Sequence, residues 1–402
     1  MQHSDPRAAH PSARLLDVGE AAPWFCAPAL SGNPRYVFDS AAGRPMLMLF
    51  LGSGRWGPGA AALEVVARHQ ALFDDDHACF FGVTIDPDDA AQGRIAQRIP
   101  GIRWFLDYDI AISRAFGAAQ AGANGAGYAA HWLLLDPMLR VVARAPIHQG
   151  EQVIALLRSQ IARPPEHSHA PVLVVPRVFE PELCRHLISL YEREGGGESG
   201  FMREEDGKTV GRVDHSFKRR SDCDIGDVRL RDALCDRLRR RLIPQVHRAF
   251  QFQATRIERW IVACYDGASG GFFRPHRDNT TAGTAHRAFA CTINLNAEDY
   301  EGGGLRFPEF GPQTYRAPTG GAVIFSCSLL HEATPVTRGK RYAFLPFLYD
   351  EAGAALRERN QAYMEEGQGQ YRAGSRVIPL PSAGGHRQGG AKPDSGFPPE
   401  RE

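Results

Sequence analysis

A histidine–x–aspartate pair and a distant histidine are the residues of this 402-residue sequence best suited to metal chemistry. His276 and Asp278 are two positions apart, so on a β-strand their side chains would point to the same face. His331 could reach the same ion from another strand of the same domain. Two imidazoles and one carboxylate on one face form a 2-His-1-carboxylate triad, which suits Fe(II) and leaves coordination positions open.

The pair alone is weak evidence, because a chain with 15 histidines is expected to contain about one such pair by chance. His3 and Asp5 form a second pair, in an N-terminal stretch predicted to be disordered. The surroundings of His276 and His331 are more specific. Tyr265 precedes the first histidine, the segment 300–308 (Tyr-Glu-Gly-Gly-Gly-Leu-Arg-Phe-Pro) lies between the ligands, and Arg341 follows the second.

Taken as an ordered set, these motifs resemble the prolyl 4-hydroxylase-like family of 2-oxoglutarate/Fe(II) oxygenases over residues 172–350. The resemblance implies that His276, Asp278 and His331 hold Fe(II) and that 2-oxoglutarate chelates the same ion. Arg341 would pair with the far carboxylate of 2-oxoglutarate through its planar guanidinium, and Lys340 would face the opposite side of the strand. Tyr265 would donate a hydrogen bond to that carboxylate, with a buried core tyrosine as the alternative.

The same resemblance implies a reaction. O2 and 2-oxoglutarate would be consumed, succinate and CO2 released, and a substrate C–H bond hydroxylated, with ascorbate keeping the iron ferrous. A protein or peptide side chain is favoured over a small molecule as substrate, by analogy alone. The sequence leaves the substrate, the hydroxylated atom and the oligomeric state open.

The elements that must position these residues fall into two patterns. Before residue 162, apolar strand-like runs such as 45–51 and 79–85 alternate with helical patterns such as 60–73, which predicts an α/β layer with a parallel crossover. Later, two helical stretches (181–193 and 228–250) precede short strands from Arg256 onward, typical of a sandwich or jelly roll. The remaining expected elements are two strands from Trp132, joined by a turn at Asp136-Pro137, and a helix over 149–161.

The second helical stretch carries a stripe of leucines and a proline. Its leucines recur every four residues and predict a buried face, and Pro244 is expected to kink the helix or end it early. The stripe consists of Leu230, Leu234, Leu238 and Leu242. Ahead of this helix, the basic segment 218–223 could line a substrate entrance or form a solvated turn.

The first domain resembles the peroxiredoxin branch of the thioredoxin fold over residues 14–162. The landmarks are the segments 18–25, 30–34, 45–51, 82–86, 107–109 and 135–137. The chain departs from that family where its nucleophile should stand: Gly59 falls near the position of the peroxidatic cysteine, and no cysteine occurs between Cys26 and Cys79. Without a thiolate at a helix N-terminus, the domain is predicted to be non-catalytic.

Two alternatives remain open. The first is a fused thiol peroxidase that uses Cys26 or Cys79. The second is a non-catalytic iron or 2-oxoglutarate sensor whose first domain docks a partner.

The expected fold is therefore a thioredoxin-like α/β domain followed by a double-stranded β-helix (jelly-roll) domain with flanking helices. The proline-rich stretch around His167 and His169 is interpreted as a linker in which both histidines are solvated. The expected divisions are a disordered head 1–13, the first domain 14–162, a linker 163–171, the oxygenase-like domain 172–350, a helical extension 351–374 and a disordered tail 375–402.

Composition limits the classes of partner. The 47 basic and 46 acidic residues leave a net charge of +1, which argues against a dedicated nucleic-acid or membrane-surface binder. The longest apolar run, 45–51, is too short to cross a bilayer, and the first residues lack the pattern of a signal peptide. Eight scattered cysteines predict reduced thiols and a cytoplasmic location.

Overall fold

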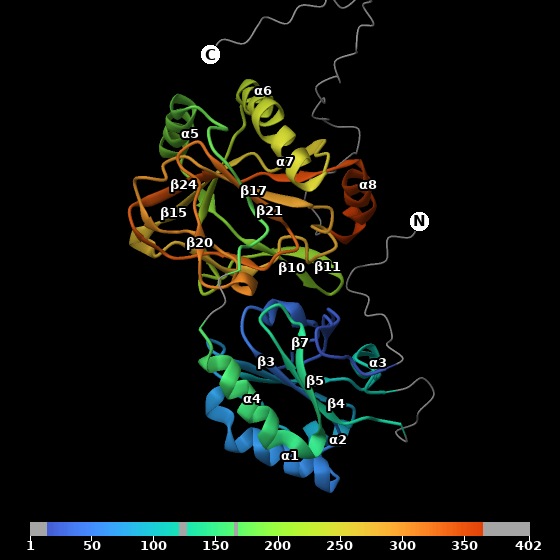
Figure 1. The fold of residues 1–402 in the computed structure, drawn as a ribbon. Helices are drawn as coiled ribbons and strands as arrows, with labels where there is room; N and C mark the ends of the chain where they lie inside the picture. The colour runs from blue at the N-terminus through green and yellow to red at the C-terminus, as the bar shows by residue number, and fades with distance from the viewer. Residues whose placement is uncertain (1–13, 120–126, 165–167, 365–402) are drawn as a thin grey trace, which may run out of the picture.

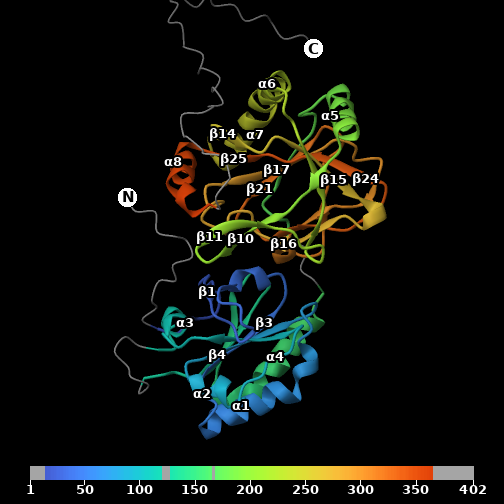
Figure 2. The ribbon, with the colours of Figure 1, turned by 180° about the vertical axis from the view of Figure 1, so that it is seen from behind.

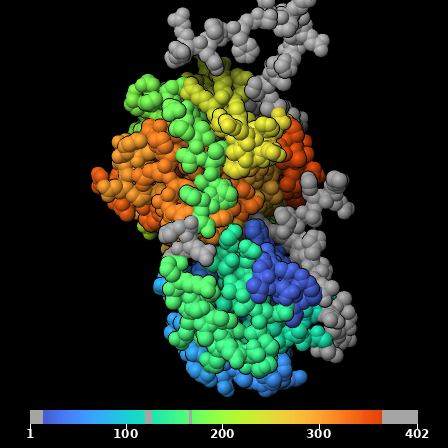
Figure 3. All heavy atoms as spheres, viewed as in Figure 1, coloured from blue at the N-terminus to red at the C-terminus, as the bar shows by residue number. Residues whose placement is uncertain are grey.

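The computed structural model describes residues 14–119, 127–164 and 168–364. The segments predicted to be disordered, 1–13 and 375–402, and His167 of the predicted linker lie outside these residues. Figures 1 and 2 show two bodies one above the other, the first formed by the early part of the chain and the second by the later part. Figure 3 shows them in contact along their junction.

The first body is built on a five-stranded mixed sheet with the order β5-β4-β3-β6-β7. The central strands β3 (Met46–Gly52), β4 (Cys79–Thr84) and β5 (Ile102–Leu106) run parallel. The last two, β6 (His131–Leu135) and β7 (Val141–Pro146), continue the sheet antiparallel. Every residue of β3 is buried because both faces of the sheet are covered.

Alternate residues of β3 enter two different cores, as strand geometry requires. One face packs against α1 (Gly57–Arg68) and α4 (Gly150–Ala162), and the other packs against α3 (Ala111–Ala115) and the segment before β3. Figure 1 shows α1 and α4 side by side beneath the sheet. The remaining elements are β1 (Cys26–Ala27), β2 (Tyr36–Val37), α2 (Pro87–Ala91) and the 3-10 turns Phe38–Ala41, Gln70–Leu72 and Ile147–Gln149. This thioredoxin-like α/β fold confirms the prediction.

The second body consists of two facing sheets. The larger has the order β14-β25-β17-β24-β15-β13-β9, with β21 and β8 attached through β17, and the smaller has the order β12-β16-β22-β19-β20. The strands of the larger sheet are β8 (Leu173–Val175), β9 (Gly197–Glu198), β13 (Ser221–Asp224), β14 (Arg256–Glu258), β15 (Ile261–Asp266), β17 (Phe289–Asn294), β21 (Ala322–Ser326), β24 (Lys340–Phe344) and β25 (Phe347–Tyr349). Those of the smaller are β12 (Lys218–Arg219), β16 (Phe272–His276), β19 (Leu305–Arg306), β20 (Thr314–Tyr315) and β22 (His331–Ala333). The predicted jelly roll is confirmed.

Two short two-stranded sheets and several helices complete this body. One is the hairpin of β10 (Phe201–Glu205) with β11 (Lys208–Arg212), and the other pairs β18 (Glu301–Gly302) with the distant β23 (Val336–Arg338). The helices are α5 (Pro181–Glu194), α6 (Val228–Arg237), α7 (Ile243–Phe250) and α8 (Glu351–Arg359), with 3-10 turns at Gly267–Ser269, Pro308–Phe310 and Asn360–Tyr363. Helices α5 to α7 bury their apolar residues against the outer face of the larger sheet.

The second predicted helical stretch stays helical past its proline. Leu234, Leu238 and Leu242 are fully buried, as the stripe predicts, whereas Leu230 at its start is only partly buried. Between α6 and α7 the chain forms a π-helical turn over Leu238–Leu242, directly before Pro244. Proline has no N–H and its ring clashes with the carbonyl four residues earlier, so a widened turn at that place lets the helix continue.

The chain leaves the first body at Ala162, where α4 ends, and enters the second at Leu173, where β8 begins. The division of the chain into residues 14–162 and 172–350 stays a prediction. The predicted helical extension is represented by α8 and the turn after it, up to Tyr363. Within the three described ranges, no helix is both long enough and apolar enough to span a membrane.

Candidate metal centre

Two adjacent strands bring the predicted ligands together. His276 ends β16 and His331 begins β22, and the two residues face each other across the antiparallel pair. Asp278 lies just beyond the end of β16, where its backbone N–H donates to the carbonyl of Cys327 at 3.0 Å. The Nε2 atoms of His276 and His331 lie 3.5 and 3.3 Å from the two oxygens of Asp278. Among the described residues this is the one cluster of three donors suited to a metal ion, all within 4.8 Å of one another.

Backbone carbonyls orient both imidazoles. Nδ1 of His276 lies 2.7 Å from the carbonyl oxygen of Arg274, and Nδ1 of His331 lies 3.0 Å from that of Leu329. A ring that donates through Nδ1 carries its lone pair on Nε2, which here faces Asp278. Both histidines therefore direct Nε2 toward the same carboxylate, as two ligands of one ion would.

The electrostatics of the cluster also suit a cation. Burial, and then the nearby His331, lower the pKa of His276 to about 4, so its imidazole is neutral at physiological pH. Burial alone would raise the pKa of Asp278, but His331 and His276 hold it well below its usual value. An ionised carboxylate and a neutral imidazole are the forms that bind metal.

Arg341 is a buried arginine whose guanidinium is not paired with any carboxylate of the described residues. It is 2% exposed, and its Nε and Nη1 have no hydrogen-bond partner among the described residues. Its neighbour Lys340 has an exposed side chain, so the two residues face opposite sides of β24 as predicted. A buried guanidinium with unpaired donors is costly on its own and matches a bidentate carboxylate such as that of 2-oxoglutarate.

Tyr265 stacks against this guanidinium. It is the cross-strand partner of Arg341, and the guanidinium carbon lies 5.0 Å from the centre of its ring. Its hydroxyl accepts a long hydrogen bond from Arg220 at 3.4 Å. The role of Tyr265 as a donor to 2-oxoglutarate stays a prediction.

Tyr300 is a residue to which the sequence assigned no role. It is 3% exposed, and its hydroxyl has no partner among the described residues. It packs in the same apolar cluster as Tyr265. Its ring and the Arg341 side chain both lie against Gly303, where an added Cβ would touch the two of them. Its place in the Tyr-Glu-Gly-Gly-Gly motif was visible in the sequence, but the direction of its side chain was not.

Comparison with known proteins now identifies this part of the chain. Residues 260–349 match the family described as the 2OG-Fe(II) oxygenase superfamily. The match lies within the jelly-roll body, which we call the oxygenase domain. The matched segment contains all three donors of the cluster, together with Tyr265, Tyr300 and Arg341.

The individual proteins that match either align over a short segment or share little sequence identity. A PKHD-type hydroxylase from a Synechococcus species is 35% identical over 89 residues, which are 21% of this chain and 39% of the relative. The chain thus spans about two fifths of that relative's length. A prolyl hydroxylase from Trichoplax adhaerens, solved with a hypoxia-inducible-factor peptide, is 19% identical over 46% of this chain and 86% of its own, with a TM-score of 0.36. AhpC of Mycobacterium tuberculosis is 17% identical over 37% of this chain and 94% of its own, with a TM-score of 0.30.

A pocket of about 910 Å³ adjoins the predicted metal ligands. His276 and Asp278 form part of its lining, which also includes residues 200–206 of the β10 hairpin. Residues 33–37, 39 and 40 of the first domain line it as well. At the rim, Arg35 pairs with Glu204 across the two domains at 3.2 Å. The pocket beside the metal site is therefore walled by both halves of the chain.

The basic segment 218–223 contributes to this pocket through Lys218. Lys218 is 4% exposed and Arg220 8%, so a solvated turn is the wrong interpretation for both. Nζ of Lys218 donates to Ser199 Oγ at 2.8 Å and lies 4.7 Å from the centre of the Phe273 ring. Burial, with the nearby Arg220, lowers the pKa of Lys218 to about 5.

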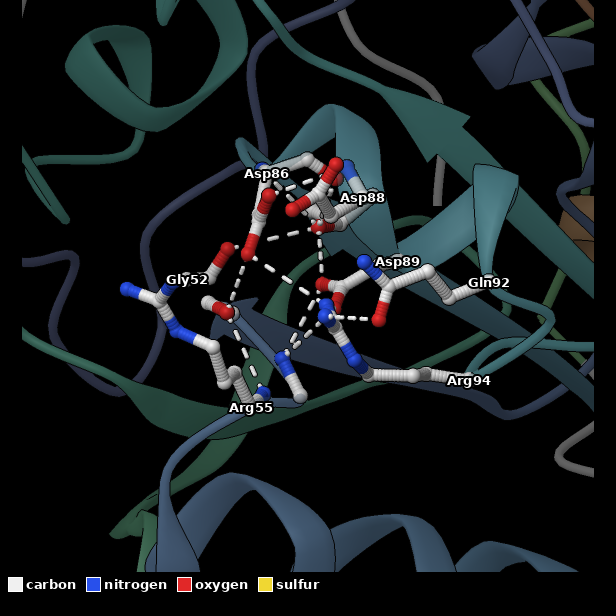
Figure 4. A network of polar contacts seen from close by, with 10 residues as sticks. Gly52, Arg55, Asp86, Asp88, Asp89, Gln92 and Arg94 are labelled. Atoms are coloured by element: carbon white, nitrogen blue, oxygen red, sulfur yellow. Dashed lines mark hydrogen bonds and ion pairs between the residues drawn. The ribbon is translucent and has the colours of Figure 1, made fainter.

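The loop that would carry a peroxidatic cysteine is held instead by the buried carboxylate of Asp89 and the half-buried one of Asp86 (Figure 4). Asp89 is fully buried and accepts hydrogen bonds from the Gly54 N–H, the Thr84 hydroxyl and Arg94 at 3.0, 2.6 and 2.8 Å. Asp86 accepts from the Ser53 hydroxyl at 2.6 Å. These contacts fix the turn between β3 and α1.

The thiols of the first domain are poorly placed for peroxide chemistry. A Cβ added at Gly59, inside the first turns of α1, would overlap the carbonyl oxygen of Ser53. Burial raises the pKa of Cys79 to about 12, which keeps that thiol protonated. Cys26 lines the pocket between the two domains rather than the start of a helix.

Proposed function

We propose that this chain is a 2-oxoglutarate- and Fe(II)-dependent dioxygenase that hydroxylates a C–H bond of a protein or peptide side chain. The observation that carries the proposal is the placement of His276, Asp278 and His331 on facing strands, with the unpaired Arg341 in the same barrel. The oxygenase family match and the hydroxylase relative support it. The choice of a protein or peptide substrate rests on likeness to hydroxylases alone.

Different residues bind the metal, the co-substrate and the substrate. The two Nε2 atoms and the Asp278 carboxylate hold Fe(II), and Arg341 holds the far carboxylate of 2-oxoglutarate. Together, bound Fe(II) and 2-oxoglutarate supply the oxidation of a substrate C–H bond by O2, with release of succinate and CO2. The apolar cluster around Tyr265 and Phe273 keeps water from the Arg341 side, and the pocket at His276 admits the substrate.

Succinate formation tests this proposal directly. The full chain, loaded with Fe(II) and ascorbate, is incubated with 2-oxoglutarate and a peptide library, and succinate and peptides that gain one oxygen atom are measured by mass spectrometry. We expect both products with the wild type and neither with His276→Ala. Lys340→Ala is the control for Arg341→Ala, because the two side chains share a strand but only Arg341 is buried. Equal product from Arg341→Ala and Lys340→Ala at limiting 2-oxoglutarate contradicts the assignment.

We also propose that the first domain has no peroxidase activity. The overlap at Gly59 and the high pKa of Cys79 support this. Purified protein should consume hydrogen peroxide no faster than the double variant Cys26→Ser/Cys79→Ser. A faster rate in the wild type would restore the fused peroxidase as the better account.

A further inference from the structure

Arg277 lies between two of the metal ligands but belongs to a different contact. His276 and Asp278 face the metal site, whereas the Arg277 side chain enters the first domain. Its Nε donates to the Asp39 carboxylate at 2.8 Å, and its Nη2 donates to the Asp39 backbone carbonyl at 3.2 Å. The guanidinium carbon also lies 4.4 Å from the centre of the Trp24 ring. Asp39 and Trp24 both belong to the first domain.

This contact is buried from solvent, and all three nitrogens of the Arg277 guanidinium donate hydrogen bonds. The side chains of Arg277 and Asp39 are 2% and 1% exposed. The guanidinium is completed by Glu309 at 2.9 Å and by the carbonyl of Ser328, both from the oxygenase domain. Breaking a buried ion pair by removing one partner is strongly destabilising, because it leaves an uncompensated charge. The position of Arg277 is therefore tied to that of Asp39.

The third ligand is anchored in the same region. Leu330, directly before His331, is fully buried and packs in an apolar cluster of the first domain that includes Phe38. Its N–H donates to Glu309 at 3.0 Å, and Glu309 also binds Arg277. Glu309 thus links the chain neighbours of all three ligands on the side that faces the first domain.

The backbone of the first domain also lies directly against the oxygenase domain at Gly43. Gly43 of the first domain has a φ of +95°, and a Cβ added there would overlap the Cβ of Pro308, the residue before Glu309. No larger residue fits without separating the two surfaces. This contact adjoins the Arg277 cluster in sequence and in space.

We propose that the first domain is a structural part of the metal centre, with Asp39 as a positioning residue that acts through Arg277 on the strand carrying His276 and Asp278. The inference rests on the proposed function, since it concerns the same centre, and it gives the non-catalytic domain a role. The same contact holds residues 33–40 against the pocket.

Metal affinity of the full chain tests the inference without any substrate. Co(II) is titrated into apo-protein, and the dissociation constant and the visible d–d spectrum are recorded. Asp39→Asn should bind Co(II) about tenfold more weakly and with an altered spectrum, a loss at the low end of that seen when a group bonded directly to a ligand is removed. The matched control is Asp75→Asn, which removes the carboxylate paired with Arg103 inside the first domain at 2.6 Å and should leave both readouts unchanged.

A double variant separates positioning from a general loss of stability. If Asp39 acts through Arg277, then Asp39→Asn/Arg277→Met should bind Co(II) no more weakly than Arg277→Met alone, within about twofold. Losses that multiply in the double variant would show that Asp39 acts by another route and would overturn the inference.

A glycine pair decides the case if Asp39→Asn does not fold. Gly43 and Gly32 both have positive φ, so alanine strains the backbone at either position, but a Cβ at Gly32 meets nothing within 4 Å. Gly43→Ala should weaken Co(II) binding and Gly32→Ala should not. Wild-type protein that binds no Co(II) would overturn the proposed function together with this inference. If the wild type binds Co(II) and Gly43→Ala binds it equally well, as does Asp39→Asn where that variant folds, this inference alone is overturned.

Discussion

Tyr300 and Arg341 both pack beside Gly303, and the Tyr300 hydroxyl and the Nε and Nη1 atoms of Arg341 are buried without a hydrogen-bond partner among the described residues. If the Tyr300 hydroxyl binds the same carboxylate as Arg341, its loss should be felt only when 2-oxoglutarate is present. Tyr300→Phe should leave the melting temperature of the apo-protein unchanged and weaken 2-oxoglutarate binding about tenfold, the effect of losing a hydrogen bond to a charged group. Calorimetric titration of the Fe(II)-loaded protein under anaerobic conditions measures the affinity. An unchanged affinity would place the hydroxyl outside the co-substrate site.

His131 gives the first domain a sensitivity to acid. Its ring is 3% exposed and stacks on Phe50 with 4.7 Å between ring centres, and burial lowers its pKa from 6.5 to about 4. In the unfolded chain the imidazole takes up a proton below about pH 6.5, whereas the buried ring stays neutral until about pH 4. The free energy of unfolding should therefore fall by roughly 3 kcal/mol between these two pH values.

Urea unfolding at a series of pH values measures this slope. His131→Phe should flatten it, and His186→Ala, which removes an exposed histidine of α5, should not. A slope that survives in His131→Phe would assign the acid sensitivity to other groups.

For single residues, the sequence indicates which side chains are suited to bind a metal better than it indicates where each side chain points. The two-residue spacing predicted that His276 and Asp278 point to one side, and their donor atoms do lie together. Strand geometry alone does not explain this, because Asp278 lies beyond the end of β16 and is held by the carbonyl of Cys327. Tyr300 stood in a motif noticed in the sequence, but whether its hydroxyl reaches into the barrel depends on β18, β23 and Arg341, which come from distant parts of the chain.

At the scale of single elements, the start of α1 shows what replaces the missing nucleophile. Gly59 touches the Ser53 carbonyl so closely that no Cβ fits, whereas Gly57, two residues earlier in the same helix, has open space around it. Gly59→Ala should destabilise the protein by about 1–3 kcal/mol through overpacking. Gly57→Ala should cost less, because its Cβ meets no neighbouring atom, although this first helical residue precedes Pro58 and gains little from alanine's helix propensity. Denaturant unfolding of the pair measures the difference, and equal effects would show that the β3–α1 turn is looser than described.

Elements with a strong local pattern were well predicted. The buried strand expected over 45–51 is β3 (Met46–Gly52), and the helix expected over 149–161 is α4 (Gly150–Ala162). The π-helical turn before Pro244 was not, because proline in a helical pattern indicates only that a hydrogen bond is lost. How the helix absorbs that loss depends on the sheet against which its leucines pack.

At the scale of the whole molecule, the buried pair of Arg277 and Asp39 joins residues 238 positions apart. No spacing rule in the sequence links two such residues, so the junction could not be predicted even though both domains could. Although a linker separates the two domains in the sequence, Leu330 of the second lies inside a cluster of the first. The domains therefore share part of one core.

A shared core predicts shared unfolding. Scanning calorimetry of the wild type should give a single transition, and Asp39→Asn should separate it into two as the domains become independent. Two transitions already present in the wild type would show that the junction contributes little to stability.

The central claim is that His276, Asp278 and His331 hold Fe(II) while Arg341 holds 2-oxoglutarate on the same ion. Anaerobic titration of the apo-protein with Fe(II) and then 2-oxoglutarate tests it most directly, because a chelated keto acid gives a visible metal-to-ligand charge-transfer band. We predict a band that is absent in His276→Ala and that needs a higher 2-oxoglutarate concentration in Arg341→Ala but not in Lys340→Ala. No band from the wild type at saturating Fe(II) would contradict the account.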